Sequence, residues 1–248
     1  YFAGYGYASV RVDMRGSGES EGLLLDEYLK LEQQDGVEVV NWLSKQNWCS
    51  GNVGMIGFSW GGITSMQVAS LNPKGLKAII PVTSSVDRYY DDAGYFLGCL
   101  VGQTIGWGVE MDSLSTRPPD PDIVGLKWKK IWKNRLKNTP PYVPIWLSHQ
   151  EKDKYWLQGT ISKNYNLIKC PVFTTGGWAD CWPNTVGRLV KNLNTNVKGI
   201  SGPWGHNYSC FAKPGPQIDF LNECIKWWDK WLKNKNNGVE KDPKITAF

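Results

Sequence analysis

The stretch VGMIGFSWGG at residues 53–62 restricts the possible folds of this chain more than any other part of its sequence. Its first five residues form a short, uninterrupted apolar run, which is typical of a strand buried on both faces of a parallel sheet. From Trp60 to Leu71 the sequence can form a helix, which a following Asn-Pro pair ends. The G-x-S-x-G pattern between them predicts a tight strand–turn–helix that leaves the hydroxyl of Ser59 exposed at the strand end.

Strand and helix patterns alternate on both sides of this segment. Residues 7–14 are rich in β-branched and apolar side chains and predict a buried strand, followed by a glycine-rich turn. Residues 28–46 predict a helix, because Val37, Val40 and Leu43 recur at intervals of three. The other predicted elements are strands over 78–82, 171–176 and 197–201 and helices over 183–193 and 217–233. This alternation predicts an α/β fold with a mostly parallel sheet flanked by helices.

The pattern changes between residues 88 and 165. This segment holds five tryptophans, the run RPPDPD and helical stretches such as 124–137. We interpret it as a helical cap inserted into the sheet domain. The predicted organisation is a first part of the core at 1–87, the cap at 88–165, and a second part of the core at 166–248.

Composition excludes several classes of protein. A chain of 248 residues with 41% hydrophobic residues can bury a sizeable core. The net charge of +5 is mild, and the densest basic stretch, 226–235, is interleaved with tryptophan and leucine as on an amphipathic helix, so we expect no nucleic-acid partner. No apolar run reaches the roughly 18 residues of a membrane span, so we expect no membrane partner. The six cysteines occur singly along the sequence, without a C-x-x-C pair, which predicts reduced thiols and a cytoplasmic location.

A nucleophilic serine needs a base, and the sequence contains two histidines, His149 and His206. His149 lies within the predicted cap, where a structural or surface role is the ordinary one. His206, in the motif GPWGH, follows the predicted strand 197–201 at the carboxyl end, where α/β sheets place their chemistry. We therefore predict His206 as the base.

The acid of a triad should lie on a strand-end loop between the serine and the histidine. Asp180, in GGWADCW, meets this condition after strand 171–176, and Asp87, after strand 78–82, is the alternative. With Asp180 in this role, His206 would take the Ser59 proton as Oγ attacks a carbonyl, and water would later clear the acyl-enzyme. The backbone N–H of Trp60 would be one oxyanion donor, with a second from a loop after an earlier strand.

Aromatic and acidic residues near these positions are candidates for substrate contact. Trp178, Trp182 and Trp204 each lie two residues from a predicted triad member and would line an apolar pocket, unless they are packing residues. Asp91 and Asp92 stand in an acidic cluster at the start of the cap. They would hold a substrate amine if they face the site, and otherwise form a solvated turn.

These motifs resemble those of the cocaine esterase-like (CocE/NonD) hydrolases, which are related to X-Pro dipeptidyl-peptidases and α-amino-acid ester hydrolases. The matching stretches are VDMRGSGESEG (12–22), WCSGNVGMIGFSWGG (48–62), KAIIP (77–81), GGWADCW (176–182) and GPWGH (202–206). The resemblance implies an α/β-hydrolase fold with a helical cap, the same three residues as triad, and no metal or organic cofactor. It also implies a tyrosine oxyanion donor upstream of residue 1.

Compared with that family, N-terminal strands and any C-terminal β-sandwich would be missing from this chain. An earlier strand lies between the strand that resembles 7–14 and the Ser59 strand in the family, so two strand edges would lack partners here. We therefore expect a fragment of a longer enzyme.

The sequence predicts a serine hydrolase that cleaves a carboxylic ester or acyl bond in a small-molecule ester or short peptide. An X-Pro dipeptidyl-peptidase or α-amino-acid ester hydrolase is the alternative within the enzyme class. A non-catalytic binding protein on the same fold, or an interaction module that uses the tryptophan-rich cap, is the alternative outside it. The sequence makes no prediction of oligomeric state.

Overall fold

The computed structural model describes residues 1–92, 95–96 and 99–248 and divides into two compact units. The sheet unit comprises Tyr1–Ser9, Gly36–Asp87 and Thr160–Phe248. The helical unit comprises Val10–Asp35 and Arg88–Gly159. The helical unit thus combines residues 10–35 with residues 88–159. The predicted division into a core at 1–87 and 166–248 and a cap at 88–165 stays a prediction.

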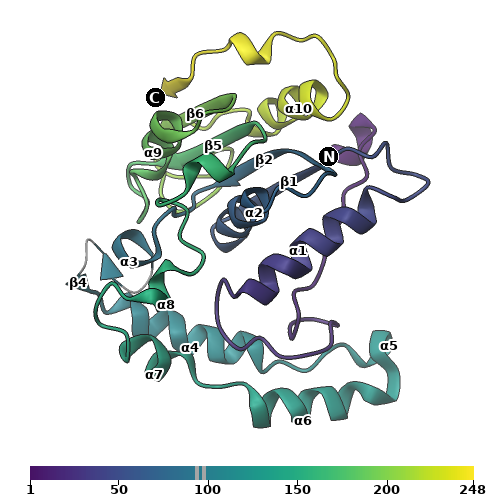
Figure 1. Cartoon of the computed structure of the whole chain (residues 1–248), viewed down its shortest axis with the longest axis vertical. Coiled ribbons are helices and arrows are strands. Elements are labelled where there is room, and N and C mark those ends of the chain that lie inside the picture. The colour runs from purple at the N-terminus through teal and green to yellow at the C-terminus, as the bar shows by residue number, and fades with distance from the viewer. Residues whose placement is uncertain (93–94, 97–98) are drawn as a thin grey trace. The chain divides into compact units, whose positions relative to one another are not determined.

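The sheet unit is built on a parallel sheet, which Figure 1 shows from β1 and β2 in blue to β5 and β6 in green. Its strands, in spatial order, are β1 (Val53–Phe58), β2 (Leu76–Val82), β5 (Val172–Gly177), β6 (Val197–Gly202) and β7 (Ile245–Ala247). Neighbouring strands run parallel throughout. Because parallel strands present their carboxyl ends at the same edge, the loops after β1, β5 and β6 leave the sheet on one side.

The two faces of this sheet bury separate hydrophobic clusters. Along β2, Ile79 belongs to one cluster, and its neighbours Ala78 and Ile80 belong to the other, as the alternation of side chains along a strand requires. The first cluster includes side chains of α1 (Lys30–Leu43), α2 (Trp60–Ser70) and α9 (Thr185–Asn192). The second includes α10 (Phe220–Trp231). Helices therefore cover both faces, which is the layered α/β architecture that the sequence predicts.

The helix α10 is amphipathic, as predicted. The carboxylate of Asp219 accepts a hydrogen bond from the backbone N–H of Asn222 and caps the helix at its start. Phe220, Trp227 and Trp228 are buried against the sheet. The lysines of this segment are thus explained by an ordinary core-facing helix.

In its described residues, the helical unit consists of helices and a pair of antiparallel strands. Its elements are α3 (Arg88–Asp91), β3 (Tyr95–Phe96), β4 (Cys99–Leu100), α4 (Gln103–Ser115), α5 (Pro121–Val124), a 3-10 turn (Gly125–Lys127), α6 (Trp128–Asn138), α7 (Tyr142–Leu147) and α8 (Lys154–Leu157). Further 3-10 turns at Phe2–Tyr5, Tyr165–Leu167 and Val239–Lys241 belong to the sheet unit. None of the helices within the described ranges is long and apolar enough to cross a membrane.

Buried hydrogen bonds hold residues 10–35 within the helical unit. The guanidinium of Arg135, which is 1% exposed, donates to the carbonyls of Gly18 and Ser20 at 2.9 and 2.8 Å. The indole of Trp146 donates to the carboxylate of Asp26 at 2.9 Å. The glycine-rich turn is therefore held by Arg135, and the residues after it by Trp146, both from the distant segment 88–159.

The predicted strand over 7–14 is wrong. These residues have no regular secondary structure, and Val10 and Val12 are exposed. A strand needs a neighbour to accept and donate its backbone hydrogen bonds, and β1 forms the edge of the sheet in the described part of the chain. The structure also contains the strand β7, which the sequence did not predict, because its three residues carry no periodic pattern.

Candidate active site

Ser59 occupies a strained turn between β1 and α2. Its backbone has φ 55° and ψ −117°, a conformation that a residue with a side chain rarely adopts. The turn is fixed on both sides, because the Ser59 N–H donates to the carbonyl of Val82 and the Ser59 carbonyl accepts from the N–H groups of Gly62 and Ile63. This is the geometry that exposes a nucleophilic side chain at the end of a strand.

Two glycines around Ser59 are required by close backbone contacts. A Cβ on Gly57 would lie 2.1 Å from the carbonyl group of Gly61, and a Cβ on Gly62 would lie 2.7 Å from the Cβ of Ser84. A Cβ on Gly61 would meet no atom within 4 Å. The close approach of strand and helix therefore depends on Gly57 and Gly62.

The loops after β5 and β6 are joined to each other by backbone hydrogen bonds. The N–H of Trp178 donates to the carbonyl of Gly202, and the N–H of Ala179 donates to the carbonyl of Trp204. A Cβ on Gly177 would lie 1.8 Å from the Trp204 carbonyl oxygen, so only glycine permits this contact. The first loop carries Asp180 and the second carries His206.

The structure brings Ser59, Asp180 and His206 together. Nε2 of His206 lies 3.0 Å from the Ser59 Oγ, and Nδ1 lies 3.0 Å from an Asp180 carboxylate oxygen, Oδ1. In the tautomer protonated at Nδ1, the imidazole donates to Asp180 and accepts from the serine hydroxyl. The Asp180 side chain is 1% exposed, whereas that of His206 is 37% exposed.

The environment of Asp180 favours its ionised form. Burial by itself would raise the pKa of this carboxyl group. Hydrogen bonds from His206, Cys181 and the Trp182 backbone outweigh burial and lower the pKa below its ordinary value. The second carboxylate oxygen, Oδ2, is buried and has no hydrogen-bond partner among the described residues. Asp180 can therefore hold the imidazole and stabilise a positive charge on it.

Three further side chains contact His206; Trp182 was a predicted site residue, whereas Phe58 and Cys181 were not. The ring of Phe58 lies 4.8 Å from the imidazole, and Trp182 meets it edge-on at 5.2 Å. The sulfur of Cys181 lies 4.0 Å from Nδ1 and 3.1 Å from Oδ1 of Asp180. Phe58 and Cys181 are direct neighbours of Ser59 and Asp180 in the chain, which was the available signal.

The other tryptophans predicted near the site have different surroundings. Trp178 is 54% exposed, whereas Trp204 is buried in the core and its indole donates to the carbonyl of Pro216. The backbone N–H of Trp60 lies at the first residue of α2, where the helix dipole is positive. Roles in substrate and oxyanion contact stay predictions for these residues.

The alternative acid and the second histidine have other partners. The carboxylate of Asp87 accepts from the hydroxyl of Ser162 at 2.7 Å. The Nδ1 of His149 contacts Asp153, and its ring stacks on that of Tyr155 at 4.1 Å. Both arrangements are structural contacts within their own units.

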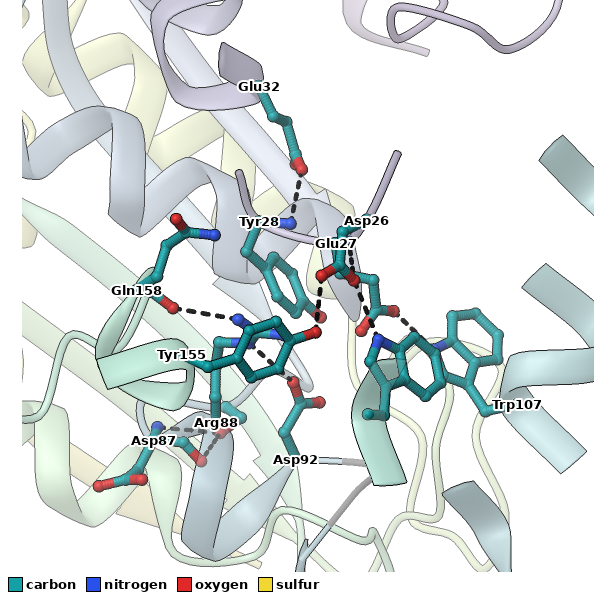
Figure 2. A network of polar contacts seen from close by, with 12 residues as sticks. Asp26, Glu27, Tyr28, Glu32, Asp87, Arg88, Asp92, Trp107, Tyr155 and Gln158 are labelled. Carbon is teal, nitrogen blue, oxygen red and sulfur yellow. Dashed lines mark hydrogen bonds and ion pairs between the residues drawn. The ribbon is translucent and has the colours of Figure 1, made fainter. Parts of the chain in front are cut away.

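Asp91 and Asp92 are buried rather than solvated. Figure 2 shows Asp92 beside Arg88 in a polar network of the helical unit, with the carboxylate 3.9 Å from the guanidinium Nε. In the same network the indole of Trp107 donates to Glu27, and burial raises the pKa of Glu27 well above its ordinary value. Asp91 lies in α3 and is 4% exposed. Contact of either aspartate with a substrate amine stays a prediction.

The sheet order, the strained serine and the loops that carry Asp180 and His206 define an α/β-hydrolase. A CocE/NonD family hydrolase from Staphylococcus aureus shares this fold, with a TM-score of 0.74 and 23% identity over 94% of this chain and 38% of that one. No disulfide joins the cysteines within the described residues.

The family model for X-Pro dipeptidyl-peptidase (S15 family) matches residues 1–208. The chain therefore belongs to this family, to which the CocE/NonD hydrolases that its motifs resemble are related.

Similar curated proteins include the cocaine esterase of a Rhodococcus species, which is 28% identical over 98% of this chain and 48% of its own length. A Mycobacterium bovis protein, provisionally named a serine esterase, is 41% identical over the whole chain and 48% of its own length. The chain thus spans about half the length of these relatives.

Proposed function

We propose that this chain carries the catalytic centre of a serine hydrolase that cleaves a carboxylic ester or another acyl bond. The observation that carries the proposal is the position of the His206 imidazole, which is hydrogen-bonded to Ser59 on one side and to Asp180 on the other, each at 3.0 Å. A structural histidine has no need of a strained serine at one nitrogen and a buried carboxylate at the other. The esterases among the similar proteins support this assignment.

The proposed reaction begins at the Ser59 hydroxyl. His206 Nε2 removes its proton as Oγ attacks the substrate carbonyl carbon, and the protonated imidazole then donates that proton to the leaving group. Asp180 stabilises the imidazolium, since its carboxylate has a lowered pKa and accepts from Nδ1. Water, activated by the same imidazole, hydrolyses the acyl-enzyme and returns the serine.

The negative charge on the substrate oxygen develops near the start of α2. The Trp60 N–H directly follows the nucleophile and belongs to the first residue of this helix. The positive end of the helix dipole favours an anion at this position. We assign the Trp60 N–H as one oxyanion donor; removal of a single donor of this kind costs roughly 10²–10³ in kcat.

Labelling with a fluorophosphonate tests the nucleophile. We expect the probe to label the chain and to fail on Ser59→Ala. The matched control is Ser70→Ala, because Ser70 is the last residue of the helix that Ser59 caps and its hydroxyl donates to the carbonyl of Gln67. We expect the control to label like the parent. Equal labelling of Ser59→Ala would remove the proposal and favour a binding protein on this fold.

A second candidate is a peptidase that releases Xaa-Pro dipeptides, because the family model that matches most of the chain bears that description. Such an enzyme must recognise a free substrate amine, for which Asp91 and Asp92 are the proposed carboxylates. A pair of Gly-Pro anilides, one with a free amine and one N-acetylated, separates the candidates. Preference for the free amine, lost in Asp91→Asn or Asp92→Asn, would favour the peptidase. Equal rates would favour the esterase.

A further inference from the structure

Cys181 adds a thiol to the two groups that orient the proposed base. Its sulfur, the Nδ1 of His206 and a carboxylate oxygen of Asp180 all lie within 4.8 Å of one another. The side chains of Cys181 and His206 are both partly exposed. We propose that these three residues bind a soft divalent cation such as Zn²⁺ and that this cation and the catalytic arrangement of His206 exclude each other.

The distances between the three donor atoms fit a zinc ion. Zn²⁺ binds sulfur at about 2.3 Å, imidazole nitrogen at about 2.05 Å and carboxylate oxygen at about 2.0 Å. In a tetrahedron these bond lengths separate S and N by about 3.6 Å, S and O by about 3.5 Å and N and O by about 3.3 Å. The observed separations are 4.0, 3.1 and 3.0 Å. Each differs from the tetrahedral value by about 0.3–0.4 Å, which small side-chain rotations can supply.

The surroundings of the donors also suit a cation. Asp180 is oriented by the backbone N–H of Trp182 at 3.1 Å, the kind of supporting hydrogen bond that fixes metal ligands. Its Oδ2 is buried without a hydrogen-bond partner in the described chain, so the carboxylate has acceptor capacity left over. Thiolate, imidazole and carboxylate together form a ligand set that zinc prefers, with a fourth position open to water.

Binding changes the state of His206 directly. Bonds form from the metal to Cys181 sulfur, His206 Nδ1 and Asp180 oxygen; the thiol proton leaves to solvent, and the Nδ1 proton moves through solvent to Nε2, so that the imidazole stays neutral. The hydrogen bond from Nδ1 to Asp180 is thereby lost. Because Nε2 then carries the imidazole proton, it cannot accept the proton of the Ser59 hydroxyl. This inhibitory consequence rests on the proposed function, whereas the metal site itself does not.

Cobalt spectroscopy tests the site independently of catalysis. Co²⁺ is titrated into the full chain carrying Ser59→Ala, which keeps all three ligands and has no nucleophile. We expect a thiolate-to-cobalt charge-transfer band that Zn²⁺ abolishes by displacement. Adding Cys181→Ser should remove the band and weaken Zn²⁺ binding by at least about 100-fold, more than loss of a supporting partner costs. The matched control is Cys49→Ser, at another partly exposed cysteine, which should retain the band.

Two results would overturn the site: no thiolate band in the Ser59→Ala chain, or a band and Zn²⁺ affinity unchanged by Cys181→Ser. A separate measurement tests the inhibition, namely fluorophosphonate labelling of the parent chain with and without Zn²⁺. We expect Zn²⁺ to slow labelling at least about tenfold and a chelator to restore it. Normal labelling at saturating Zn²⁺ would overturn the inhibition. A chain that binds cobalt through Cys181 but never labels would refute the proposed function and leave the metal site standing.

Discussion

Gly57 and Gly61 flank Ser59 in the same motif, but the structure predicts opposite results for their replacement by alanine. A Cβ on Gly57 would lie 2.1 Å from the Gly61 carbonyl group and 2.6 Å from the nitrogen of Gly62. A Cβ on Gly61 would meet nothing within 4 Å. The two variants add the same methyl group, so they separate a steric requirement from a general need for small residues.

The magnitude follows from the required displacement. Ordinary contact begins at 3.4 Å, so Gly57→Ala must move the start of α2 by about 1.3 Å, the difference between 3.4 and 2.1 Å. Such a movement separates Ser59 Oγ from His206 Nε2, now 3.0 Å apart. A misplacement of about 1 Å can cost roughly 10²-fold in rate, and overpacking costs roughly 1–3 kcal/mol in the free energy of unfolding.

The assay combines the rate of fluorophosphonate labelling with the thermal midpoint of unfolding. We expect Gly57→Ala to label at least about 100-fold more slowly and to melt at lower temperature. Gly61→Ala should label at a rate within about twofold of the parent, with a midpoint equal or higher, because alanine is favoured over glycine within a helix by about 0.5–1 kcal/mol. If Gly57→Ala had the labelling rate and the thermal midpoint of the parent chain, the close contact would be refuted. Equal damage in both variants would refute the steric explanation.

Three further predictions concern charged groups. Burial raises the pKa of Glu27 above its unfolded value, so the folded state holds this proton more tightly and the free energy of unfolding falls as pH rises above the ordinary glutamic acid range. The thermal midpoint of Glu27→Gln should therefore drop less between pH 5 and 8 than that of the parent chain. An equal drop in both chains would contradict the shift. Lys198, 8% exposed, binds Glu223 and Asp242, so Lys198→Met should lower the free energy of unfolding by about 2 kcal/mol in urea titrations. Asp180→Asn should lower kcat/KM by roughly 10³–10⁴-fold with little change in thermal midpoint, because the amide favours the wrong imidazole tautomer. If the variant had the same kcat/KM as the parent chain, Asp180 would not be the acid of the triad.

Local sequence patterns were sufficient for the elements that carry the candidate site. The apolar run that became β1, the glycine motif around Ser59 and the motifs holding Asp180 and His206 each predicted an element type from a few adjacent residues. The sheet edge where they meet followed from one general property, that parallel strands end on the same side. These predictions succeeded because side-chain period and turn chemistry are set by near neighbours.

The same kind of reasoning failed where the outcome depends on a distant partner. Residues 7–14 have the composition of a strand but no neighbouring strand, whereas β7 is three residues long and has the edge of β6 to pair with. Backbone hydrogen bonds across a sheet, and not composition, decide such cases.

What the sequence by itself predicted is the α/β class, the strands that became β1, β2, β5 and β6, and a candidate triad of Ser59, His206 and an acid for which Asp180 was favoured and Asp87 left open. Only the tertiary structure decided that Asp180, rather than Asp87, meets His206, and that the Cys181 thiol lies 4.0 Å from the same imidazole. It also decided that residues 10–35 join the helical unit through Arg135. The physical reason is that element type depends on local periodicity, whereas the pairing of buried polar groups depends on which distant segments the fold brings within hydrogen-bond range.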